Sequence, residues 1–149
     1  MVANLEGRLD FTFDLESLLK DAGLVAASAA ATVGGTAKVI NVGTAVMRST
    51  LVIDVTDIEI ASNNELYTVV VQGCAASDFS SGVQNLAALD FGATEVRPGG
   101  AADSVTGRFH LPFTNLQDGT IYPYIRVYTV VAGTIATGIN YTAFMAKNG

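Results

Sequence analysis

The stretch 121–146 constrains the fold more than any other part of the chain. β-branched and aromatic residues with a period of two are typical of a strand whose two faces differ. One phase of its first run holds Tyr124, Arg126, Tyr128 and Val130, and the other holds Ile125, Val127, Thr129 and Val131. A break of small residues at 132–138 has a glycine near each end, and 139–145 is a second extended run. We predict that 121–146 forms the long closing hairpin of an all-β domain.

Several other runs have the composition of short strands. These runs are 38–43, 50–60, 66–73, 85–91 and 106–113. The apolar phase of 50–60 shifts near Thr56 and Asp57, which predicts a β-bulge. We expect 50–60 and 66–73 to pair as an antiparallel hairpin. Pro112 cannot donate to a strand ladder, so 106–113 should lie at a sheet edge or end there. Asp118-Gly119 is the strongest turn signal.

The N-terminal part of the chain is harder to assign. Residues 1–13 are expected to form an arm that ends in a short strand, with Leu9, Phe11 and Phe13 in one phase. Residues 14–20 fit either one or two helical turns with Asp14 as the N-cap, or an irregular loop. The small side chains of 22–36 suit close backbone packing or a mobile linker.

About eight short strands with almost no convincing helix favour a single-domain antiparallel β-sandwich or jelly roll, with a closed barrel as the alternative. We expect an N-terminal arm and linker at 1–36 and the sandwich at 37–149, together one structural unit. The length of 149 residues fits one domain. A content of 50% hydrophobic and 15% charged residues is too apolar for a disordered chain.

Charge argues against nucleic acid as a partner. The net charge is −6, and the eight Lys and Arg residues are scattered without a basic cluster. The first residues, MVANLEGRLDF, lack the apolar core of a signal peptide. The Ala-rich run 24–33 has about half the length that a membrane span needs. We therefore expect a soluble protein that binds neither nucleic acid nor membrane and whose apolar surface is partly covered by protein partners.

Candidate catalytic residues are few. The one histidine, His110, lies in the phase opposite its apolar neighbours, and we expect it on the solvent or interface face of a strand. The one cysteine, Cys74, excludes an intrachain disulfide and the usual zinc sets, and is expected to be a small buried hydrophobe. Asp57 and Glu59 are more typical of a solvated strand face than of a hydrolytic pair. We predict no enzyme, no metal site and no cofactor, with a hydrolase that uses these acidic side chains as a minor alternative.

Tyr124, Arg126 and Tyr128 are the candidate partner-contact residues. They project from one face of a predicted strand as an aromatic–arginine–aromatic row. Tyr and Arg are enriched at binding hot spots because they bury a large area and keep polar groups. The alternative is an arginine stacked between tyrosines on an ordinary outer sheet face.

Six short segments carry a family resemblance. They are 21–30 (DAGLVAASAA), 39–43 (VINVG), 67–73 (YTVVVQG) with the following loop 77–79 (SDF), 111–113 (LPF), 124–128 (YIRVY) and 131–134 (VAGT). Together they resemble the capsid cement or decoration family of tailed-phage heads, which usually carries Ser where Cys74 stands.

The resemblance implies a jelly-roll-like β-protein without catalytic residues. It also implies a homotrimer on the outer surface of the capsid that bridges neighbouring major capsid proteins. The alternative is a receptor- or glycan-binding β-sandwich accessory protein of the virion, in the tail or a fibre. The tyrosine row motivates this alternative, since aromatic rings stack on sugars.

Overall fold

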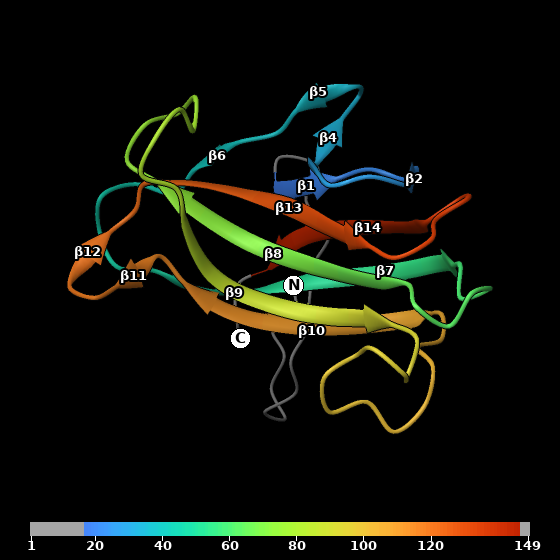
Figure 1. Ribbon diagram of the computed structural model, residues 1–149. Helices are drawn as coiled ribbons and strands as arrows, with labels where there is room; N and C mark the ends of the chain where they lie inside the picture. Colours follow the sequence, from blue (N-terminus) through green and yellow to red (C-terminus); the bar gives the residue numbers. More distant parts are fainter. Residues whose placement is uncertain (1–16, 147–149) are drawn as a thin grey trace, which may run out of the picture.

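The computed structural model describes residues 17–146, which form antiparallel β-sheets with almost no helix (Figure 1). The first sheet has the order β1-β14-β7-β10, and β2 also pairs with β14. Its strands are β1 (Leu18–Lys20), β2 (Leu24–Val25), β14 (Ile139–Ala146), β7 (Arg48–Ile58) and β10 (Gly107–Thr114). The all-β, antiparallel prediction is confirmed.

The second sheet has the order β3-β13-β8-β9, and β6 also pairs with β13. Its strands are β3 (Ala29–Ala30), β6 (Ile40–Asn41), β13 (Tyr124–Ala132), β8 (Leu66–Cys74) and β9 (Gln84–Gly92). Two small ribbons complete the described chain. They are β4 (Thr32–Val33) with β5 (Thr36–Ala37), and β11 (Leu116–Gln117) with β12 (Thr120–Ile121).

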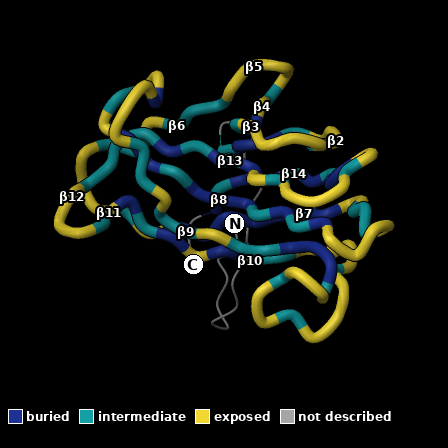
Figure 2. Tube along the Cα trace, viewed as in Figure 1, coloured by how far each residue is buried: buried dark blue, intermediate teal, exposed yellow. Residues whose placement is uncertain are grey.

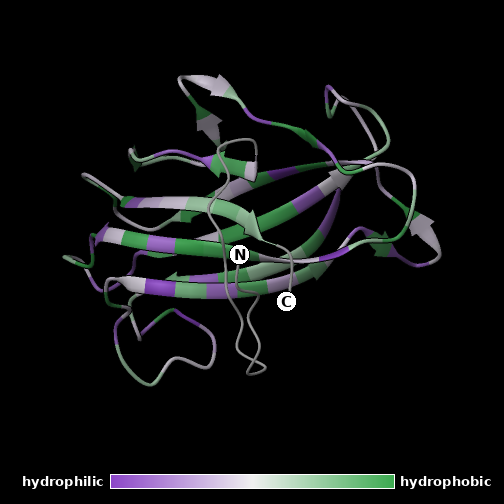
Figure 3. Cartoon of the chain, turned by 180° about the vertical axis from the view of Figure 1, so that it is seen from behind, coloured by the Kyte–Doolittle hydropathy of each residue, from purple (hydrophilic) through white to green (hydrophobic). Residues whose placement is uncertain are grey.

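One hydrophobic core lies between the two sheets, as in a β-sandwich. The first sheet contributes Leu19, Leu51, Ile53, Val55, Leu111, Phe113, Ile139, Tyr141 and Ala143. The second sheet contributes Tyr67, Val69, Val71, Phe91, Ile125 and Val127. Burial follows the strands, and the connecting loops are mostly exposed (Figure 2). Seen from behind, the strands show bands of hydrophobic and hydrophilic residues, because neighbouring side chains point to opposite faces (Figure 3).

Three local predictions are confirmed. In the β7–β14 pair, Asn140 is opposite Asp57 and Tyr141 is opposite Val55, so Thr56 is the extra residue of a bulge. Strand β10, which contains Pro112, is at the edge of the first sheet. Asp118 and Gly119 join β11 to β12 with φ values of 50° and 79°, as a two-residue hairpin turn with two left-handed residues requires.

Both predicted long hairpins are wrong. β13 pairs within the second sheet and β14 within the first, so the connection 133–138 crosses from one sheet to the other. β7 and β8 are likewise in different sheets. The alternating pattern requires only that one face of each strand is buried. A hairpin and a crossing between sheets both meet that requirement, so the pattern does not separate them.

The part of the N-terminal region that the structure describes, from residue 17 on, is built into the sandwich. Leu18–Lys20 is strand β1 on β14, and neither a helical turn nor a loop. The segment 22–36 supplies edge strands to both sheets and most of the β4–β5 ribbon, which agrees with close backbone packing. The predicted N-cap Asp14 and the alternating residues Leu9, Phe11 and Phe13 lie outside the described residues.

Candidate partner-binding surface

The outer face of β13 presents Tyr124, Arg126 and Tyr128, as the period-two pattern predicts. All three side chains are half-buried, whereas the alternate residues Ile125 and Val127 are fully buried in the core. β13 is an inner strand, flanked by β3 and β6 on one side and β8 on the other. The row therefore runs along an inner strand of the second sheet.

Arg126 is the centre of this row. Its Nε donates a hydrogen bond of 2.9 Å to Oε1 of Gln72, which is directly opposite on β8. The Nε2 of Gln72 in turn donates to Oδ1 of Asn85 on β9, at 3.1 Å. The guanidinium carbon lies 5.5 Å from the ring centroid of Tyr128. Arg126 is therefore held by a polar chain across three strands and by an aromatic ring.

Phe79 is the residue that the sequence reasoning missed at this site. It comes from the loop 75–83, yet its ring lies 4.4 Å from the Arg126 guanidinium carbon and its side chain is buried. Its φ of 52° is in the left-handed region, which is costly for an aromatic residue unless contacts offset the cost. The one aromatic residue in a loop of otherwise small or polar residues and one valine was the available signal.

One further contact ties the loop to strand β8, and another lies within the loop. The Cys74 thiol, fully buried, donates to the carbonyl of Ser81 at 3.1 Å, so the expectation of a buried cysteine is confirmed. Asp78 accepts from the backbone N–H of Ser80 at 3.1 Å, and its hydrogen bonds with Ser80 lower its pKa. The arginine row and its loop thus form one preassembled surface.

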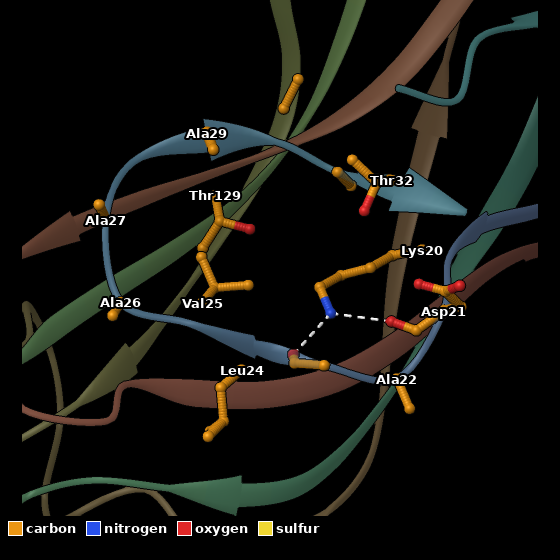
Figure 4. A pocket seen from close by; sticks show the side chains of 13 residues that line it. Lys20, Asp21, Ala22, Leu24, Val25, Ala26, Ala27, Ala29, Thr32 and Thr129 are labelled. Atoms are coloured by element: carbon orange, nitrogen blue, oxygen red, sulfur yellow. Dashed lines mark hydrogen bonds between the residues drawn. The ribbon is translucent and has the colours of Figure 1, made fainter. Parts of the chain in front are cut away.

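A buried lysine, Lys20, lies beside a cavity of about 270 Å³ that is lined by the small-residue segment 21–32 (Figure 4). The sequence did not predict this arrangement. Lys20 is 4% exposed, and its Nζ donates to three backbone carbonyls. These are Asp21 at 2.9 Å, Gly23 at 3.0 Å and Tyr141 at 2.7 Å. The ammonium also lies 4.5 Å from the Tyr141 ring centroid. Burial lowers the pKa of Lys20 to about 8, partly offset by Asp21.

Lys20 therefore acts as a fixed cation inside the fold. All three of its N–H bonds have acceptors, so no donor remains for an anionic ligand. Its contacts connect the turn between β1 and β2 to β14. Sequence pattern could not reveal this, because a lysine in a predicted helical turn or loop is normally solvated.

Glu59 and Glu65 hold connections at one end of the sandwich. The Glu59 carboxylate accepts N–H bonds from Ala136, Thr137 and Gly138, at 2.8–2.9 Å for the shortest of each, and these bonds lower its pKa. Burial of Glu65 works to raise its pKa, but bonds from backbone N–H groups, including Ser62 and Asn64, outweigh it and lower the pKa. Glu59 thus binds backbone amides while it stays accessible to solvent, and Asp57 is exposed.

His110 is exposed on the outer face of β10, as predicted, opposite Val52 of β7. Within residues 17–146, no three His, Cys, Asp or Glu side chains come together in a way that could hold a metal ion. In the same part of the chain, no helix has both the length and the apolar character needed to cross a membrane.

The chain matches no protein-family model, and no curated protein matches it significantly.

Proposed function

We propose that this chain is a non-enzymatic capsid cement protein. In this role it binds the outer surface of a tailed-phage head as a homotrimer and bridges neighbouring major capsid proteins. The observation that carries the proposal is the preassembled face around Arg126, where Tyr128, Phe79 and Gln72 hold the guanidinium in place. A surface that is ordered before binding loses little conformational entropy when a partner docks on it.

The strand order supports a jelly roll as the finer description of the fold. Along its main path, each sheet has four strands. Their order is β1-β14-β7-β10 in the first sheet and β3-β13-β8-β9 in the second. The chain passes between the sheets from β7 to β8, from β9 to β10 and from β13 to β14. Double-sheet jelly rolls are a common architecture of viral capsid proteins. The segments that resemble the cement family include parts of β8, β10 and β13.

A receptor- or glycan-binding role is the second candidate, and the geometry favours it less. Sugars stack on open aromatic faces, but the Arg126 guanidinium already lies over the rings of Phe79 and Tyr128. Phe79 is also buried. A glycan array that detects a binder, lost in Tyr128→Ala, would favour this role over cementing.

The test is made on phage heads from which the protein has been stripped. Heads without it should rupture at a lower temperature, read out by a DNA-binding dye, and adding the purified protein should restore the original temperature. Unchanged rupture after stripping would contradict the cement role. Binding of a ligand to the native shell stabilises it by mass action, so the restored temperature should rise with protein concentration.

Two arginine variants test whether the face around Arg126 contacts the capsid, independently of whether the protein is a cement protein. Arg126→Ala should weaken binding to stripped heads by about tenfold or more, as truncation of a hot-spot residue does. Arg108→Ala is the matched control. Arg108 is also paired, to Asp54 at 2.7 Å, but lies on the outer face of the first sheet. If Arg108→Ala abolishes binding and Arg126→Ala does not, the cement role survives and the contact face is wrong.

A further inference from the structure

The first sheet carries a second hydrophobic cluster, separate from the core between the sheets. It consists of Leu18 on β1, Val52 on β7, and Phe144 and Ala146 on β14. A sequence neighbour of each of these residues is in the core or packs against it. Because successive side chains of a strand point to opposite faces, the cluster lies on the face of the first sheet that is turned away from the second. We call these four residues the outer patch.

The strand register makes the outer patch continuous. Leu18 is opposite Phe144, and Phe144 is opposite Val52. Residues directly opposite each other are on the same face, with Cβ atoms about 4.5–5.5 Å apart. The Phe144 ring therefore has an apolar side chain beside it on each neighbouring strand.

The outer patch is buried more deeply than its own strands explain. Phe144 is 3% exposed. Side chains of the same sheet flank such a ring and leave its top open, and Tyr124 and Tyr128 on the outer face of the second sheet are only half-buried. The Arg108 guanidinium carbon lies 5.8 Å from the centroid of the Phe144 ring. Among residues 17–146, Val33 is the hydrophobic residue from outside these strands that packs against the patch. This burial indicates that a further segment covers the patch.

Residues 1–16 have the composition that such a segment needs. Leu9, Phe11 and Phe13 recur with a period of two, so an extended chain directs all three to one side. At the other end, residues 147–149 are Lys-Asn-Gly and include no hydrophobic residue. The described chain begins at Ser17, next to Leu18, so residues 1–16 are attached at the patch itself.

Reach and charge also fit this segment. The first sheet has the order β1-β14-β7-β10, so its face is about 14 Å wide at a strand spacing of about 4.8 Å. An extended chain spans about 3.3 Å per residue, so the segment from Leu9 to Ser17 can cross that face. Residues 1–16 include four acidic residues and one arginine, and Arg48 and Arg108 are exposed on the strands β7 and β10 beside the patch.

We propose that residues 9–13 pack on the outer patch of the same chain, with Leu9, Phe11 and Phe13 directed toward Phe144 and Val52. The patch is then closed to partners, whereas the face around Arg126 on the second sheet remains open. The inference concerns one chain by itself, so it stands or falls independently of the cement role.

Disulfide cross-linking in the full chain tests this position. Leu9→Cys, Phe11→Cys or Phe13→Cys is combined with Val52→Cys, because a disulfide forms when the two Cα atoms are about 4.4–6.8 Å apart. On mild oxidation at least one pair should form a bond within the chain, identified by peptide mapping. Val130→Cys, on the outer face of the second sheet, is the matched control and should form no such bond. Val130 is 42% exposed, so a reaction governed by exposure alone would favour the control.

A second patch position keeps the test decisive if Val52→Cys fails to fold, which thermal unfolding shows. Pro112→Cys replaces it, since Pro112 is exposed on the same face at the edge strand β10. The absence of a bond at the patch position of a folded variant would overturn the proposal. So would equal bonding to Val130→Cys, or bonds that join two chains, since these would assign the patch to a second copy.

The phase of the segment gives an independent test. Phe11→Ala should lower the midpoint of thermal unfolding by about 5 °C or more, because a buried ring is lost. Thr12→Ala, in the opposite phase, is the matched control and should leave the midpoint nearly unchanged. Equal midpoints for the two variants would show that the alternating residues do not pack on the patch.

Discussion

Lys20 shows how a single buried side chain can make the stability of the fold depend on pH. Its ammonium donates to three carbonyls, yet burial lowers its pKa from 10.5 to about 8. Between these two values the unfolded chain binds more protons at this residue than the folded chain does. The contribution of Lys20 to stability is therefore present above pH 10.5 and is lost as pH falls through about 8.

We expect the free energy of unfolding of the unchanged protein, relative to Lys20→Met, to rise by about 2 kcal/mol from pH 7 to about pH 9.5. Urea unfolding at both pH values measures this difference. Tyr67, whose pKa is raised by burial and by Glu59 and Glu65 to about 12, lowers stability at higher pH, but it is present in both proteins, so its effect cancels in this difference. A difference that stays constant with pH would contradict the assigned role of Lys20.

Glu59 is a second side chain whose interactions make stability depend on pH. Its carboxylate accepts hydrogen bonds from the backbone N–H groups of 136–138. Glu59→Gln should speed amide hydrogen exchange at these three residues, because a neutral side-chain oxygen is a weaker acceptor. Lowering the pH should do the same to the unchanged protein. The lowered pKa means that the stabilisation is present above the ordinary value of 4.5 and is lost as pH falls through the folded value.

Asp57→Asn is the matched control for this measurement. Asp57 is an exposed carboxylate two residues away on β7, and the same charge is removed. Faster exchange at 136–138 in Asp57→Asn would show that net charge, and not the hydrogen bonds of Glu59, protects the turn.

At the scale of elements, the crossing from β13 to β14 depends on glycine. Gly138 has a φ of 95°, and a Cβ atom there would lie 1.9 Å from the carbonyl oxygen of Val25. Gly138→Ala must move the backbone at the edge of the first sheet, and we expect a loss of at least about 3 kcal/mol. Gly119 also has a positive φ, of 79°, but open space around it. Gly119→Ala should therefore cost only about 1–2 kcal/mol. Chemical unfolding measures both, and equal losses would rule out the close approach to Val25.

The strands themselves could be predicted from sequence because each one buries a face. β8, β9, β10 and β13 are close to the predicted ranges, and the bulge at Thr56 follows from a phase shift. The partner of each strand could not be predicted, because alternation is the same in a hairpin and in a crossing between sheets. Strand β1 was missed because it has three residues, too few for a period to show.

The candidate site, too, could be predicted from the sequence only in part. The outward row of Tyr124, Arg126 and Tyr128 follows from the period of β13. The contacts that hold Arg126 do not, because Gln72 and Phe79 are 54 and 47 residues away in sequence. Contacts of this kind are set by the fold as a whole, and only the alignment of β8 beside β13 brings Gln72 to the arginine.

At the scale of the whole molecule, a buried hydrogen bond joins the two sheets through the core. The hydroxyl of Tyr141 on β14 bonds to the hydroxyl of Thr129 on β13, and both side chains are fully buried. Burial raises the pKa of Tyr141, so its hydroxyl stays neutral. Removing one partner leaves a buried hydroxyl without this bond, which costs about 1–3 kcal/mol, whereas removing both is much cheaper.

A double-mutant cycle tests whether this bond couples the sheets. Tyr141→Phe and Thr129→Val should each destabilise the protein, and the double variant should lose less than the sum, with a coupling of about 0.5–3 kcal/mol. Far-ultraviolet circular dichroism and tyrosine fluorescence should report one shared urea transition in each variant, because the two sheets share one core and should unfold together. Additive losses would show that the bond does not couple the sheets, and separate transitions for the two signals would show that the sandwich does not unfold as a unit.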